Sequence, residues 1–188
     1  MLKFLVRLVF YKICFRVEVI NYENIKDING AVICPNHTTW MDGVFMWAMK
    51  GKKIYAMAKA ELFKNPVIGW FFKNVINMFP INRGSRDFKS ILHAVNLVKD
   101  GKMVVMFPEG TRNGIAKGIK PKVGAAFIAT KGNVPLVPVK IEGTQKLFSK
   151  VKIIIGKPMY FEYKENDKEY LKECTAKLMD EIINLKEV

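Results

Sequence analysis

The sequence has 188 residues, half of them hydrophobic, and a formal net charge of +14. A chain of this length can bury the core of one domain, and no uncharged apolar run in it approaches the ~18 residues typical of a membrane-spanning helix. Residues 1–160 hold 26 basic and 9 acidic side chains, whereas residues 161–188 hold 5 and 8. Such a positive field suits anionic lipid, phosphorylated substrates, an acidic carrier protein or nucleic acid, so charge alone does not choose among these partners.

The first sixteen residues combine bulky apolar side chains with four cations. Lys12 and Arg16 interrupt the apolar region, and no small-residue cleavage site follows, which disfavours a signal peptide. The cations form no clean polar face on a helix, but long basic side chains can extend to water from a helix lying in the interface. We predict a membrane-contacting helix over residues 1–16, with a core helix as the alternative, and a separate domain over residues 17–188.

Apolar runs, alternation and helical periodicity predict the remaining elements. In chain order they are strand 15–19, strand 31–34, helix 40–49, strand 54–58, helix 66–75, strand 76–81, helix 87–99, strand 103–107, helix 122–130, strand 134–141, strand 151–155 and an acidic helix 164–185. This alternation predicts a single α/β domain with a central mixed, partly parallel sheet flanked by helices.

Three of these elements carry more specific expectations. Strand 134–141 contains two prolines, which indicates an edge or irregular position. Three consecutive aromatics, residues 70–72, cannot all point inward from helix 66–75, so some exposure to lipid or acyl chain is expected. His93 lies off the apolar stripe of helix 87–99 and is expected at the surface.

Two loops carry the chemistry, and each follows an apolar run that reads as a buried strand. Loops that leave the carboxyl ends of parallel strands are where ligands bind. His37 and Asp42 follow strand 31–34; five apart on a helix they would sit about 140° apart, so His37 must lie in the turn. With Thr39 as the N-cap, Asp42 could hold one imidazole tautomer and leave the other nitrogen free to take a proton. The alternative is a capping box, in which Asp42 only satisfies a backbone donor.

Four blocks together are similar to the motifs of the glycerolipid acyltransferase family, and most like those of its bacterial 1-acyl-sn-glycerol-3-phosphate acyltransferases. They occur in the family's order, at residues 36–42 (Asn-His-x4-Asp), 79–83 (Phe-Pro-Ile-Asn-Arg), 107–112 (Phe-Pro-Glu-Gly-Thr-Arg) and 134–138 (Val-Pro-Leu-Val-Pro). One departure is Thr39, where Ser is more usual; it keeps the hydroxyl.

The resemblance implies transfer of a fatty acyl group from an acyl thioester, carried by acyl carrier protein or coenzyme A, to the sn-2 hydroxyl of lysophosphatidic acid. It implies that His37 is the general base, that Asp42 orients it, and that no acyl-enzyme forms. It also implies an acceptor site with an anion clamp. The residues of that acceptor site would be Arg83, Glu109, Gly110, Thr111 and Arg112.

The resemblance implies no metal or redox cofactor, and two histidines with three unpaired cysteines make no zinc site. Cys34 lies in an apolar run, which argues against a nucleophile. The expected location is the cytoplasmic face of the cell membrane, as a peripheral or monotopic protein on anionic phospholipid. One alternative is the same transfer to glycerol 3-phosphate, another lysophospholipid or a lyso-aminolipid. Another is a basic nucleic-acid-binding module, disfavoured because the basic residues are spread and no nucleic-acid motif occurs.

Overall fold

A computed structural model describes residues 9, 14–49, 53–82, 87–143, 146 and 148–186. Most of the predicted N-terminal helix and Arg83 therefore lie outside the described residues. The elements are β1 (Arg16–Ile20), α2 (Glu23–Lys26), β2 (Ala31–Pro35), α3 (Asp42–Phe45), η2 (Met46–Ala48), β3 (Ile54–Lys59), η3 (Ala60–Phe63), α4 (Pro66–Asn74), β4 (Met78–Ile81), α5 (Phe88–Lys99), β5 (Met103–Val105), α6 (Gly124–Gly132), β6 (Leu136–Gly143), β7 (Lys150–Ile155) and α7 (Lys168–Asn184).

The strands form one mixed sheet in the order β1-β7-β6-β2-β5-β3-β4. The neighbours from β6 to β4 pair in parallel, β7 runs antiparallel to β6, and β1 runs parallel to β7. The predicted α/β domain with a mixed, partly parallel sheet is confirmed. Because β2, β3, β4, β5 and β6 point the same way, their carboxyl ends meet at one edge of the sheet, which we call the carboxyl edge.

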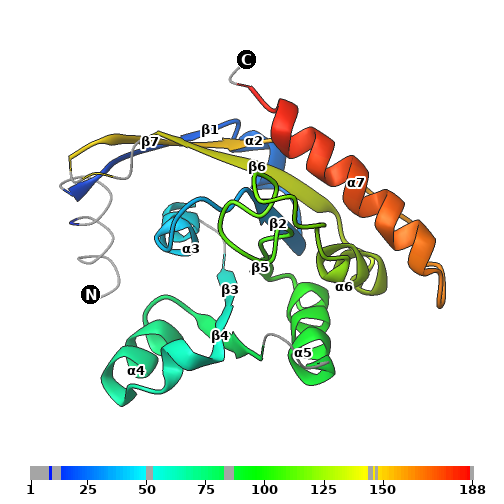
Figure 1. Cartoon of the computed structure of the whole chain (residues 1–188), viewed down its shortest axis with the longest axis horizontal. Helices are drawn as coiled ribbons and strands as arrows, with labels where there is room; N and C mark the ends of the chain where they lie inside the picture. The colour runs from blue at the N-terminus through cyan, green and yellow to red at the C-terminus, as the bar shows by residue number, and fades with distance from the viewer. Residues whose placement is uncertain are drawn as a thin grey trace.

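The buried side chains form two layers, one on each face of the sheet. In β2, Ala31 and Ile33 join one layer, whereas Val32 and Cys34 join the other, as strand geometry requires. In Figure 1, α5, α6 and α7 lie on one side of the central strands and α3 lies on the other. Both faces are covered, which explains why the central strands read as continuous apolar runs.

The helix predicted at residues 40–49 is shorter than expected. It begins at Asp42, as α3, and continues as the 3-10 helix η2. The turn before it is held by the Asp42 side chain, which accepts from the backbone N–H groups of Thr38 and Thr39. Thr39 is therefore not the N-cap, and Asp42 takes the first helical position instead of the third.

Of the two positions predicted for strand 134–141, edge or irregular, the edge position is wrong. β6 lies inside the sheet, between β7 and β2. The Pro138 carbonyl accepts from the Gly156 N–H at 2.8 Å. The backbone nitrogen of Pro138, which has no hydrogen to donate, therefore also faces β7. It lies just beyond the last residue pair of the β6–β7 ladder, Val139 with Ile155. A proline costs little there, because the ladder ends at this point. The short elements α2 and η3 were not predicted.

Candidate active site

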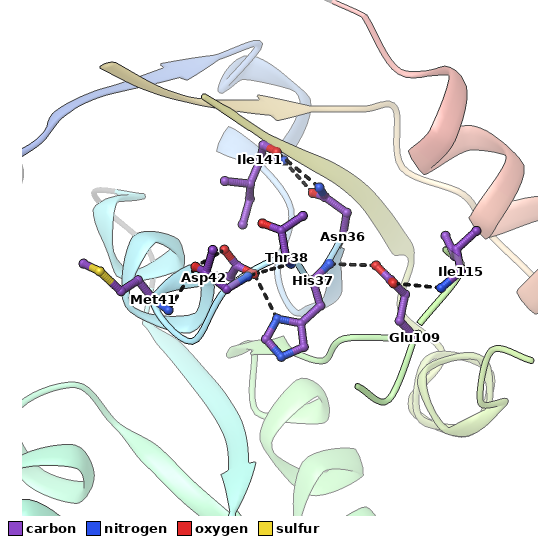
Figure 2. Close-up of polar contacts among 9 residues, drawn as sticks. Asn36, His37, Thr38, Met41, Asp42, Glu109, Ile115 and Ile141 are labelled. Atoms are coloured by element: carbon purple, nitrogen blue, oxygen red, sulfur yellow. Dashed lines mark hydrogen bonds and ion pairs between the residues drawn. The ribbon is translucent and has the colours of Figure 1, made fainter. Parts of the chain in front are cut away.

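Asp42 is the anchor of the loop that follows β2. Its side chain is 0% exposed, and its Oδ2 accepts from the Thr38 and Thr39 N–H groups at 2.7 and 2.8 Å. The same oxygen lies 2.9 Å from His37 Nδ1 (Figure 2). The carboxylate therefore does what both sequence interpretations proposed: it satisfies backbone donors and it holds the imidazole. An ionised carboxylate only accepts, so this contact favours the neutral tautomer of His37 that carries its proton on Nδ1 and leaves the lone pair on Nε2.

His37 itself is held by the loop that follows β5. Its N–H donates to Glu109 Oε1 at 2.7 Å, and its carbonyl accepts from the Asn113 N–H at 2.7 Å. The imidazole stacks on the Phe107 ring, with centroids 4.1 Å apart. The residue as a whole is 9% exposed. Because β2 and β5 are neighbours in the sheet, their two loops meet at this one residue.

Glu109 bridges two backbone amides. It is 3% exposed, and its second oxygen accepts from the Ile115 N–H at 3.2 Å (Figure 2). A Cβ on Gly114 would stand 2.9 Å from the Glu109 carbonyl oxygen and 3.4 Å from its Oε2, so only glycine leaves room there. The sequence placed Glu109 in the acceptor site; in the structure each of its oxygens accepts from one backbone N–H.

The other predicted acceptor-site residues lie next to this bridge. Gly110 has a φ of +68°, a left-handed conformation that favours glycine, and a Cβ there would come within 2.9 Å of the Lys122 side chain. Thr111 is half-buried and Arg112 is exposed. Arg112 immediately precedes Asn113, whose N–H donates to the His37 carbonyl. The Arg112 side chain therefore leaves the backbone at the rim of the site. Arg83 is not described, but β4, which precedes it, ends at the same carboxyl edge.

Sequence reasoning missed the role of Asn36 as an anchor. Its side-chain amide accepts from the Ile141 N–H at 2.7 Å and donates to the Ile141 carbonyl at 3.2 Å, which ties the catalytic loop to β6 (Figure 2). It also gave no role to Asn113, whose N–H donates to the His37 carbonyl and whose φ is 53°. The available signals were an amide directly before the histidine and an Asn-Gly pair after the Glu-Gly-Thr-Arg block.

The remaining candidate groups do not join the site. Burial raises the pKa of the Cys34 thiol, which keeps it protonated and unreactive. His93 is exposed and packs edge-on against Phe79, as expected for a surface residue. Within the described ranges, no group of three or more His, Cys, Asp or Glu side chains could hold a metal ion.

Comparison with known proteins identifies the family. The acyltransferase family model matches residues 16–142, which include every described residue of the site. The chain belongs to the acyltransferase family. It is 38% identical over 150 residues to the 1-acyl-sn-glycerol-3-phosphate acyltransferase of Bacillus subtilis, an alignment that covers 77% of this chain and 74% of that protein. The nucleic-acid-binding alternative is thereby set aside.

Two further relatives agree. The chain is 36% identical over 124 residues to the enzyme of the same name from Streptococcus pneumoniae, covering 65% of this chain and 45% of that protein, so it spans less than half of that relative. The crystal structure of the 1-acyl-sn-glycerophosphate (LPA) acyltransferase PlsC from Thermotoga maritima superposes with a TM-score of 0.61 and 28% identity, covering 92% of this chain and 74% of that one. The fold around the site is thus that of a solved acyltransferase.

Proposed function

We propose that this acyltransferase moves a fatty acyl group from a thioester donor to the free sn-2 hydroxyl of 1-acyl-sn-glycerol 3-phosphate, giving phosphatidic acid. The observation that carries the chemistry is the His37–Asp42 pair, with Nδ1 held at 2.9 Å by a buried carboxylate and Nε2 left as the base. The choice of acceptor is supported by the activity named for the relatives from Bacillus subtilis and Streptococcus pneumoniae.

In the proposed reaction the acceptor hydroxyl attacks the donor directly. His37 Nε2 takes the hydroxyl proton as the oxygen bonds to the thioester carbonyl carbon, and Asp42 stabilises the imidazolium that forms. The C–S bond then breaks, and the departing sulfur takes the proton back from His37. No oxidation state changes and a thiolate leaves readily, so the step needs neither a metal nor a redox cofactor, only acyl-acyl carrier protein or acyl-coenzyme A as co-substrate.

In this proposal the residues at the rim of the site bind the phosphate group of the acceptor. Arg112 and Arg83 suit bidentate phosphate contacts, with Gly110 and Thr111 supplying close backbone approach. Glu109 supports this site indirectly, because it fixes the loop that carries Arg112.

The proposed setting is the cytoplasmic face of the cell membrane, on anionic phospholipid. In the part of the chain that the structure describes, no helix has both the length and the hydropathy needed to cross a bilayer. Residues 1–16 remain our proposed membrane-contacting segment, and residues 17–188 the acyltransferase domain.

The test is an assay of the pure protein with labelled lysophosphatidate and each thioester donor in turn. Wild type should form phosphatidate. His37→Ala should lower turnover by a factor on the order of 10²–10⁴, and Asp42→Asn should lose most of it. His93→Ala, which changes the other histidine, is the matched control and should keep full activity.

Two outcomes would contradict the proposal. If His37→Ala keeps more than about a tenth of the wild-type rate, His37 is not the base. If glycerol 3-phosphate or another lysolipid is acylated in preference to lysophosphatidate, the chemistry stands and the proposed acceptor is wrong.

A further inference from the structure

One group of exposed apolar side chains lies beside the carboxyl edge. Of the fourteen large exposed hydrophobic side chains among the described residues, four belong to a nine-residue stretch of η3 and α4: Leu62, Val67, Ile68 and Trp70. η3 follows directly on the carboxyl end of β3, at the same edge from which the catalytic loop leaves β2. In Figure 1, α4 and α3 lie toward the same side, while α7 lies across the molecule from α4. We call the outer surface of residues 62–70 the α4 surface.

The inward side of α4 packs against η3, so the α4 surface is the side of the helix that has no role in this packing. A Cβ on Gly69 would stand 2.9 Å from the Phe63 carbonyl oxygen, which shows how closely α4 packs on η3. Phe72 packs edge-on against Phe63, with ring centroids 6.3 Å apart. By contrast Val67 and Trp70, one turn apart on the helix, are 75% and 58% exposed. Of the three consecutive aromatics, Trp70 alone is exposed; Phe71 and Phe72 are half-buried.

The charges around this surface are cationic. No Asp or Glu occurs from residue 62 to residue 82, whereas Lys64 and Lys73 are both exposed. Glu61, just before, pairs with Lys59 at 3.1 Å. A bulky apolar surface that includes an exposed tryptophan and is flanked by lysines matches the interface of an anionic bilayer, where indole rings sit at headgroup level and lysines reach lipid phosphates.

We propose that the α4 surface docks on an anionic lipid bilayer and turns the carboxyl edge, with His37, toward the membrane. It is a second contact, separate from residues 1–16. The proposal deepens the proposed function and rests on it for one point only: a lipid acceptor must reach the site from a membrane. A second copy of the chain and an acidic carrier protein are the rival occupants.

A site-specific fluorophore tests the contact directly. Val67→Cys and, as matched control, Ile183→Cys on α7, each in a Cys14→Ser background, would carry an environment-sensitive dye; Cys34 and Cys174 are buried and stay unlabelled. Ile183 is also an exposed aliphatic residue, at 50%. On vesicles of mixed phosphatidylglycerol and phosphatidylcholine, the dye at 67 should brighten and shift to the blue, and the dye at 183 should not change.

Three results would overturn the proposal. The dye at 67 could stay unchanged while the protein floats with the vesicles. It could respond to protein concentration without lipid, which indicates a second copy, or to acyl carrier protein without lipid, which indicates a protein partner.

A function-based test separates this proposal from the proposed activity. Val67→Ser with Trp70→Ser should weaken partition into anionic vesicles by about tenfold or more, from the lost apolar burial. Turnover of vesicle-borne acceptor should fall with it, while turnover in detergent micelles is retained; Ile183→Ser should behave as wild type. Unchanged partition overturns the docking surface alone. No wild-type turnover in either assembly overturns the proposed function instead.

Discussion

His37 is held at four points by residues from two loops. Asp42 holds its Nδ1, Glu109 holds its N–H, the Asn113 N–H holds its carbonyl, and the Phe107 ring stacks on the imidazole. A general base works only when its nitrogen is placed within about half an ångström of the productive position. The residues of the β5 loop that looked like substrate ligands in the sequence therefore also serve to position the base.

Glu109 offers a test of that positioning role. Glu109→Ala leaves the buried N–H of His37 and the partly buried N–H of Ile115 without their acceptor. A buried donor left unsatisfied costs about 1–3 kcal/mol in the free energy of unfolding, and the Ile115 donor costs less because water can reach it. It should lower both that free energy, measured by urea denaturation, and kcat. Glu109→Gln keeps one acceptor oxygen and should fall between. A raised KM for the acceptor with unchanged kcat and stability would show that Glu109 binds substrate.

Gly114 makes room for that carboxylate, and Gly118 provides the matched control. Gly114→Ala puts a methyl 2.9 Å from the Glu109 carbonyl oxygen, whereas Gly118→Ala meets nothing within 4 Å but has a φ of +69°. Gly118→Ala should cost about 1–2 kcal/mol of stability from its left-handed backbone and keep kcat. Gly114→Ala should lose most of kcat in steady-state assays. Equal kcat values for the two variants would mean that the Glu109 bridge does not matter to turnover.

The arginines at the rim are expected to affect acceptor binding. Arg112→Ala and Arg83→Ala should each raise the KM for the phosphorylated acceptor far more than the KM for the thioester donor. A lost charge-assisted contact costs about 1.5–3 kcal/mol. Steady-state kinetics with each substrate varied in turn measures both constants, and a parallel rise in the two would point to a structural role.

At the scale of elements, the site depends on segments that leave neighbouring parallel strands at the same edge. β2 ends in the catalytic loop, β5 in the Glu109 loop, and β3 in η3 and α4. The side chain of Asn36 also connects the catalytic loop to a fourth strand, β6, through its hydrogen bond with Ile141. Each segment begins where its strand stops, so the lengths of the strands set which side chains reach the edge.

The start of α4 depends on its cap. The Asn65 side chain accepts from the Val67 and Ile68 N–H groups at 3.0 and 3.1 Å, with Pro66 in the first turn. Asn65→Ala should lower the free energy of unfolding by about 1 kcal/mol. Asn65→Asp keeps the acceptor and adds a favourable charge at the helix N-terminus, so it should equal or exceed wild type. Urea denaturation of the three proteins measures this, and an Asn65→Ala midpoint equal to wild type would contradict it.

At the scale of the whole molecule, the charge is polarised. The acidic C-terminal segment forms α7, which packs on α6 and β6 through Cys174, Leu178 and Ile182.

β1 and β7 run opposite to β2, so β1 begins at the carboxyl edge, where Arg16 pairs in register with Lys150. The first residue of β1 therefore lies at the edge that also carries the active site.

Deleting residues 2–12 tests the proposed membrane-contacting segment. The deletion should weaken binding to anionic vesicles and turnover of vesicle-borne acceptor, and affect turnover in detergent micelles less. Each cation near an anionic surface contributes about 1 kcal/mol, and salt should weaken that part. Flotation at low and high salt, beside both activity assays, measures the effect. A folded truncation that floats like wild type would show that the segment belongs to the core and that docking rests on the α4 surface.

The sequence alone determined whatever depends on neighbours along the chain. Apolar runs located the central strands to within a few residues, because burial on both faces leaves few polar positions in them, and alternation of apolar and charged residues located β1. The pairing of His37 with Asp42 was predictable because only four residues separate them. The N-cap assignment failed at the same place, since the carboxylate also bound the turn before the helix and delayed its start.

Only the tertiary structure decided what depends on strand order and register. Glu109 lies 72 residues from His37, and nothing local indicates that its carboxylate accepts from the His37 backbone; that contact exists because β5 is hydrogen-bonded beside β2. Pro135 and Pro138 indicated an edge or irregular position, yet β6 is internal to the sheet, and Pro138 is tolerated because it lies just beyond the end of the β7 ladder. Sequence patterns report which face of an element is buried, whereas the neighbours of each strand are chosen by the packing of the whole sheet.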